Sequence, residues 1–186
     1  MKKLTVVALA GLITFGGVGT ASAEQPQNTA SIGYAFSHIK NFGNLNGVNL
    51  NYRYEFTPEW GAIGSFSWLK GSDTDYTDYT TKDDVNMYSL LVGPTYRLNN
   101  YVSFYGQIGV SFMHLKEKAW DYDSFGSSEN TTGHNTGFAY GVGVQFNPSD
   151  NLAVTVGYEG SSFKAKENIN DSFSANGFNV GVGYSF

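Results

Sequence analysis

The 186-residue chain contains no cysteine, only four prolines and, after its first 23 residues, no long apolar run. Without cysteine, no disulfide framework can hold the fold together. Polar residues interrupt every later stretch well before 18 apolar residues accumulate, so no later segment is expected to cross a membrane as a helix. The scarcity of proline beside 23 glycines, 13 tyrosines and 14 phenylalanines favours β-sheet over a disordered or collagen-like chain.

Residues 1–23 are predicted to be a secretory signal peptide that precedes a single mature domain of residues 24–186. Lys2 and Lys3 provide its charged start, residues 4–18 its apolar stretch and Ala21-Ser22-Ala23 its small-residue cleavage site. The apolar stretch is short and broken by glycines, whereas a spanning helix needs roughly 20 apolar residues. We therefore expect cleavage rather than a retained membrane anchor.

Basic residues are also few. Without the two lysines of the signal peptide, nine Lys and Arg stand against sixteen Asp and Glu, which gives a mature net charge of −7. Because nucleic-acid-binding proteins present a basic face, no nucleic-acid partner is expected.

What the mature chain does contain is period-2 alternation. Within 48–56, for example, Val48, Leu50 and Tyr52 alternate with Asn49, Asn51 and Arg53. Eight such runs occur, at 31–36, 48–56, 62–69, 88–98, 102–112, 137–146, 152–159 and 178–186. An even number of alternating strands predicts an all-β fold, an eight-stranded antiparallel up-and-down transmembrane β-barrel with the apolar face toward lipid.

A soluble, lipocalin-type barrel would instead place the apolar face inside. One face of the runs is aromatic and β-branched, while the other holds Gly, Ser, Asn and a few charges. The first set would overfill the interior of eight strands, so the lipid-facing arrangement is favoured. A barrel of this size has no room for an aqueous channel, which argues against a pore.

Connections alternate between short and long. Residues 57–60, 99–100 and 147–151 have turn composition, whereas 38–46, 70–84, 116–136 and 164–172 are expected to be long polar loops. Barrels of this kind keep short turns in the periplasm and long loops outside. The pattern predicts an outer-membrane location with both termini periplasmic and four loops on the cell surface.

Several strand motifs resemble those of the outer-membrane protein X / attachment-invasion (Ail) / Lom family of enteric bacteria. They are Gly47-Val48-Asn49-Leu50-Asn51-Tyr52-Arg53-Tyr54-Glu55, Gly93-Pro94-Thr95-Tyr96-Arg97, Tyr140-Gly141 with Gln145-Phe146-Asn147-Pro148, and the closing Gly181-x-Gly183-Tyr184-x-Phe186. Asn51 stands where the family has Lys, and Ser185 where it has Lys or Arg. The resemblance implies a virulence-associated surface adhesin or serum-resistance protein.

The inward faces of these strands carry four charged residues, Arg53, Glu55, Arg97 and Glu159. Two cations and two carboxylates could balance each other, and balance matters because an unpaired buried charge is costly. We therefore expect the four to form an ion network inside the barrel.

Catalytic and metal-binding patterns are weak. His38, His114 and His134 lie near strand ends, and no nucleophile motif accompanies them, so no enzyme and no cofactor is expected. The segment Asp73-Thr74-Asp75-Tyr76-Thr77-Asp78 has carboxylates suited to hard cations but lacks the glycine and distal Glu of a helical calcium loop. A solvated acidic loop and weak cation bridging to lipopolysaccharide both remain open.

The long loops also carry aromatic residues, Tyr76, Tyr79, Trp120, Tyr122 and Phe125, which are candidate contacts for a protein partner. Host cell-surface, matrix or complement proteins are the partners that the resemblance implies for a monomeric barrel in lipid and lipopolysaccharide. The acidic 70–84 loop argues against heparin-like partners. The alternative is a structural or stress-related envelope protein with no dedicated ligand.

Overall fold

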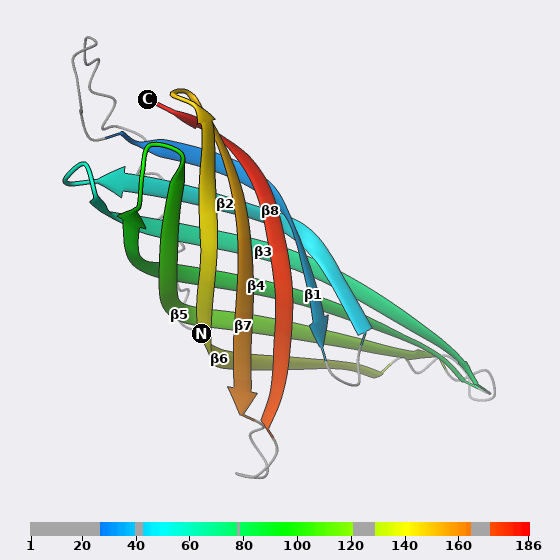
Figure 1. Ribbon diagram of the computed structural model, residues 1–186. Helices are drawn as coiled ribbons and strands as arrows, with labels where there is room; N and C mark the ends of the chain where they lie inside the picture. Colours follow the sequence, from blue (N-terminus) through cyan, green and yellow to red (C-terminus); the bar gives the residue numbers. More distant parts are fainter. Residues whose placement is uncertain (1–26, 40–42, 78, 121–128, 165–171) are drawn as a thin grey trace, which may run out of the picture.

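The computed structural model describes residues 27–39, 43–77, 79–120, 129–164 and 172–186. Its strands are β1 (Thr29–Ile39), β2 (Gly43–Glu55), β3 (Trp60–Thr77), β4 (Tyr79–Arg97), β5 (Val102–Trp120), β6 (Glu129–Ser149), β7 (Leu152–Lys164) and β8 (Ser172–Ser185). They form a closed antiparallel barrel in which consecutive strands pair and β8 returns to β1 (Figure 1). The described residues include no helix long and apolar enough to span a bilayer. The predicted signal peptide lies outside them.

The predicted faces are confirmed on all eight strands. Among the described residues, thirty large apolar side chains point outward with 37% to 62% of their surface exposed, from Phe36 and Val144 to Ile108. Soluble monomers rarely expose a contiguous apolar patch larger than a few hundred Å². The outer surface is therefore built to face lipid.

Inward side chains fill the barrel. Polar groups dominate, among them Arg53, Glu55 and Gln145, each with 2% of its surface exposed. Small residues make room for the larger ones: a Cβ at Gly143 would lie 2.3 Å from the Tyr105 hydroxyl, and one at Gly157 2.4 Å from it. The interior is packed as an eight-stranded barrel requires.

One end of the barrel, the turn end, carries the three tight turns and the described ends of the chain. Asn28 and Phe186 exchange two backbone hydrogen bonds of 2.9 Å there. In the turn between β4 and β5, the Asn99 side chain accepts hydrogen bonds from the backbone N–H groups of Tyr101 and Val102 at 2.9 and 2.8 Å. These contacts are the turn chemistry expected of asparagine.

The opposite end, the loop end, corrects one prediction. Residues 70–77, 79–84 and much of 116–136 are strand rather than loop, because β3 and β4 pair as far as Thr77 and Tyr79 and β5 and β6 as far as Ala119 and Glu129. Strands β3 to β6 have 18 to 21 residues, against 11 to 14 for the other four. Figure 1 shows these four extending together beyond the rest of the barrel.

A row of outward polar residues marks where the lipid-facing surface stops. Direct cross-strand partners form this boundary row: Asn46, Lys70, Asn86, His114 and His134. The row just below it, toward the turn end, is apolar on β2 to β5, where Val48, Trp68, Tyr88 and Phe112 are likewise cross-strand partners; its β6 member is Thr136. We call the apolar surface below the boundary row the band, and the strands beyond it the outer section.

Candidate functional site

Three of the four charged residues predicted for the lumen gather at the turn end. Glu55 Oε1 lies 2.7 Å from Arg53 Nη2 and 2.6 Å from Arg97 Nη2, so one carboxylate faces two guanidinium groups. Glu55 Oε2 also accepts a 3.0 Å hydrogen bond from the backbone N–H of Gln27. Arg97 donates to the Gln27 side chain at 3.3 Å. The start of the described chain is thereby fixed across the floor of the lumen.

Glu159 does not join this cluster, contrary to the expectation from sequence. It lies seven residues into β7 from Leu152, whereas Arg97 ends β4 and Glu55 ends β2, both at the turn end. Its Oε2 instead accepts a 2.9 Å hydrogen bond from Ser67. Its alternating position correctly predicted that Glu159 faces inward, but Glu159 lies farther along the barrel axis than Arg53 and Arg97.

Neutral hydrogen bonds occupy the middle of the lumen. Ser65 donates to Asn51 at 2.5 Å, Asn51 donates to Asn49 at 2.6 Å, and Asn49 donates to Ser67 at 2.9 Å. Ser65 in turn accepts from Gln107 at 2.7 Å. Asn51, which replaces a family lysine, is therefore satisfied without a counter-charge.

Ser185, the other departure from the family pattern, is equally satisfied. Its hydroxyl lies 2.9 Å from that of Thr29 and accepts a 3.2 Å hydrogen bond from Asn147. Both departures exchange a cation for a neutral group that its neighbours can pair. Because these groups are buried, their hydrogen bonds offset the free-energy cost of removing them from water.

The interior changes character near the boundary row. Ser67, Ser89 and Ser111 are inward cross-strand partners, and two residues farther along come Leu69, Met87 and Met113. The apolar set forms a cluster that we call the plug, buried to 5% exposure or less: Ala35, Ile39, Leu45, Leu69, Val85, Met87, Met113, Phe163 and Ala175. The plug separates the polar lumen from the loop end. It was not among the features predicted from the sequence.

The candidate partner-contact aromatics lie at the loop end. Tyr76 belongs to β3, Tyr79 to β4 and Trp120 to β5, and the register pairs Thr80 with both Tyr76 and Trp120. Tyr76 and Trp120 therefore flank Thr80 in one row across three strands of the outer section, and Tyr79 precedes Thr80 in the chain. Tyr122 and Phe125 lie outside the described residues.

The three histidines take positions that the sequence did not reveal. His38 Nδ1 lies 2.9 Å from the side-chain oxygen of Asn44, while His114 and His134 face each other across β5 and β6. In the part of the chain that the structure describes, no histidine is hydrogen-bonded to a carboxylate, and no group of three or more His, Cys, Asp or Glu could hold a metal ion. Asp78 is outside that part.

Comparison with known proteins gives consistent matches. Residues 7–186 match the family model described as outer membrane protein beta-barrel domain. Over their full lengths, the chain is 41% identical to the virulence membrane protein PagC of Salmonella typhimurium. It is 35% identical to outer membrane protein X of Escherichia coli, again with complete coverage of both chains.

The solved structures agree. The attachment invasion locus protein Ail of Yersinia pestis, crystallised with the heparin analogue sucrose octasulfate, superposes with a TM-score of 0.68 and 37% identity. The match covers 87% of this chain and 99% of that one. The protein is an integral component of the bacterial outer membrane, and it belongs to the outer-membrane β-barrel family that includes PagC, Ail and outer membrane protein X.

Proposed function

We propose that this protein is a virulence-associated surface adhesin or serum-resistance factor whose outer section contacts host proteins. The observation that carries the proposal is the length of β3 to β6, which continue well beyond the polar boundary row of Lys70, Asn86, His114 and His134. A strand needs only about 9–11 residues to cross the membrane. Strands of 18 to 21 residues have far more than crossing requires.

The orientation follows the usual rule for these barrels. Short turns belong in the periplasm and the longer connections outside, so the turn end and both termini would be periplasmic. A cleaved signal peptide of residues 1–23 would deliver the chain there. The outer section would then project from the cell surface, with lipopolysaccharide around its base.

The outer section offers two recognition features. Pairing of β6 with β7 runs only as far as Gly137, so within the described residues β6 pairs with β5 alone from Glu129 to Thr136. Such an edge can recruit an extended segment of another protein by backbone hydrogen bonding. Trp120, on the adjacent β5, lies close to that edge and would add an aromatic anchor.

Charge favours a protein over a sulfated polysaccharide. The β3–β4 extension contains Asp73, Asp75, Asp83 and Asp84 against Lys70 and Lys82. An acidic surface repels polyanions, so binding of heparin-like molecules should be weaker than for the Yersinia pestis relative. The attachment that gives that relative its name would here depend on protein contacts.

A pair of truncations matched to the strand register tests the proposal. Glu117 pairs with Thr131, so replacing 117–131 by Asn-Gly joins Lys116 to its partner Thr132 through a two-residue hairpin turn. The control replaces 73–83 by Asn-Gly, which joins Ser72 to its partner Asp84. Both variants should still assemble in the outer membrane, because every residue of the band is retained.

Adhesion to epithelial cells and survival in serum are then compared among the parent, both truncations and a strain lacking the gene. We expect the 117–131 truncation to fall to the level of the deletion strain and the 73–83 truncation to lose less. Full adhesion by the 117–131 variant would exclude the β5–β6 extension as the contact. A parent no more adhesive or serum-resistant than the deletion strain would favour the structural envelope role.

A further inference from the structure

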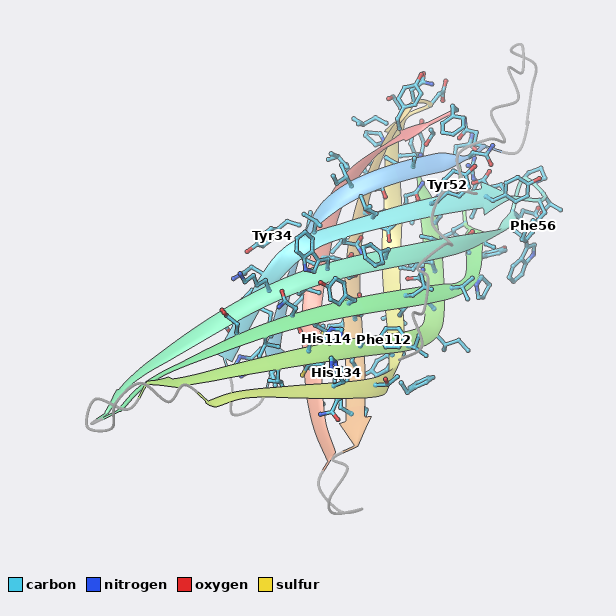
Figure 2. All side chains as sticks on the ribbon, turned by 180° about the vertical axis from the view of Figure 1, so that it is seen from behind. Tyr34, Tyr52, Phe56, Phe112, His114 and His134 are labelled. Carbon is cyan, nitrogen blue, oxygen red and sulfur yellow. The ribbon has the colours of Figure 1, made fainter. Side chains whose placement is uncertain are left out.

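Two of the three histidines form a pair on the outer surface at the boundary row. His114 on β5 and His134 on β6 are direct cross-strand partners, with ring centroids 4.6 Å apart and ring planes at 89°. Figure 2 labels them on neighbouring strands just beyond Phe112. His134 is exposed and His114 is half-buried. The pair is thus accessible from outside the barrel.

From this geometry we infer that His114 and His134 form a binding site for a first-row divalent transition metal ion, with Cu²⁺ bound most tightly. Imidazole nitrogen binds such ions at about 2.0–2.1 Å, which places two ring centroids about 4.5 Å apart at a square-planar angle and about 5.2 Å apart at a tetrahedral one. The observed 4.6 Å falls within that interval. Rotation of the rings alone would aim both nitrogens at one ion.

The backbone holds the pair at this separation. Cross-strand partners keep their Cβ atoms about 4.5–5.5 Å apart, and the register between β5 and β6 is continuous from Val102–Phe146 through His114–His134 to Ala119–Glu129. Ligands on a continuous ladder need little ordering before binding, which favours affinity. Two protein ligands leave the remaining positions open for water or an exchangeable ligand.

The neighbours of His114 support this assignment. Asn86 is its cross-strand partner on β4, and the amide oxygen is a further donor for a divalent ion. Tyr88 packs edge-on against the His114 ring at 6.0 Å and is stacked on Trp68 at 6.3 Å. Packing on one side restricts the rotamers of His114 and brings a tryptophan near enough for bound Cu²⁺ to quench its fluorescence.

The test is a titration of the refolded full-length barrel in detergent with CuCl₂, followed by tryptophan fluorescence and by electron paramagnetic resonance. The parent should bind one Cu²⁺ ion with two nitrogen ligands. H114Q and H134Q should each weaken binding by roughly tenfold or more, because one of two imidazole ligands is lost. The matched control is H38Q, which removes a histidine near the same boundary on another strand and should bind as the parent does.

Parental affinity in H114Q or H134Q, or loss of binding in H38Q, would overturn the site. Heat-dependent gel mobility shows whether each variant is folded. Should either variant of the pair fail to fold, the spectra of the parent and H38Q decide, since a single nitrogen ligand in both would exclude the pair. A shared two-nitrogen spectrum would support it.

Discussion

The band and the outer section are parts of the same strands, yet they present opposite faces. Along β4, Tyr88, Leu90 and Val92 point outward in the band, whereas Asn86 points outward at the boundary. Inside, Ser89 lies in the band, Met87 lies between the last band row and the boundary row, and Val85 lies in the outer section. Both faces exchange polarity within about two residues, so a single strand has a membrane-protein pattern at one end and a soluble-protein pattern at the other.

The surroundings explain the inversion. In lipid, an outward apolar side chain costs nothing, and the backbone closes its own hydrogen bonds around a polar lumen. Beyond the lipid, water surrounds the strands, and apolar residues gain free energy only by packing inside. The plug straddles the boundary row and is the hydrophobic core of the loop end, whereas the polar lumen below it holds together by charge pairing and hydrogen bonds.

The largest loss of stability is expected when the carboxylate shared by Arg53 and Arg97 is removed from the polar lumen. In Glu55→Gln, two guanidinium groups would lose the charge that both contact. We expect a loss of about 3–5 kcal/mol in the free energy of unfolding, as when one partner of a buried pair is removed. Denaturant unfolding in micelles measures it.

The control for that experiment is Glu59→Gln, in the exposed turn between β2 and β3. It should change stability by less than about 0.5 kcal/mol. Equal unfolding midpoints for the two variants would mean that the charge cluster contributes nothing to the barrel.

The plug should respond to loss of volume. Phe163 is fully buried within it, so Phe163→Ala should cost about 3 kcal/mol through lost burial and the cavity that remains. Phe112→Ala removes the same ring from the outward face, where 43% of it is exposed, and should cost clearly less in the same unfolding assay. An equal or larger effect at Phe112 would show that the plug is not a packed core.

A smaller effect is expected from placing a charge on the outward face. Ile108 lies in the band and is 62% exposed there, so Ile108→Lys should cost about 2 kcal/mol in lipid bilayers. The same charge at the boundary, in Asn86→Lys, should cost less than about 1 kcal/mol, chiefly through repulsion by its cross-strand partner Lys70. The free energy of folding into vesicles is measured for both variants. Similar losses at both positions would mean that the lipid-facing surface does not end at the boundary row.

Alternation in the sequence was sufficient to predict the number of strands, their faces and the closed barrel, because side chains with period 2 report the environment directly. It failed where the environment changed along a strand. Residues 70–84 read as a loop because their outward positions are polar, although Val85 and Met87 alternate inward with the register intact. Apolar residues at inward positions next to polar residues at outward positions were the available signal for the longer strands and for the plug.

Contacts between strands were harder to predict, since they depend on register and depth. Glu159 has the parity of Arg53 and Arg97 but lies at a different level of the lumen, so charge balance alone gave the wrong partner. The pairing of His114 with His134 joins residues 20 positions apart and follows only from the β5–β6 register. Counting back from the turn of the hairpin would have predicted this pairing, but the sequence of 121–128 does not identify the turn residues.

On β4, lipid contact should end between Tyr88 and Asn86, and single-cysteine labelling measures where it ends. The chain has no cysteine of its own, so each introduced thiol is the only one. Cysteines replace Val92, Leu90, Tyr88, Asn86 and Asp84 in turn, and the protein in bilayers is treated with a charged, membrane-impermeant maleimide. We expect rapid labelling at positions 84 and 86 and protection from labelling at 88, 90 and 92. Labelling at position 90, or protection at position 86, would show that the lipid-facing surface ends elsewhere.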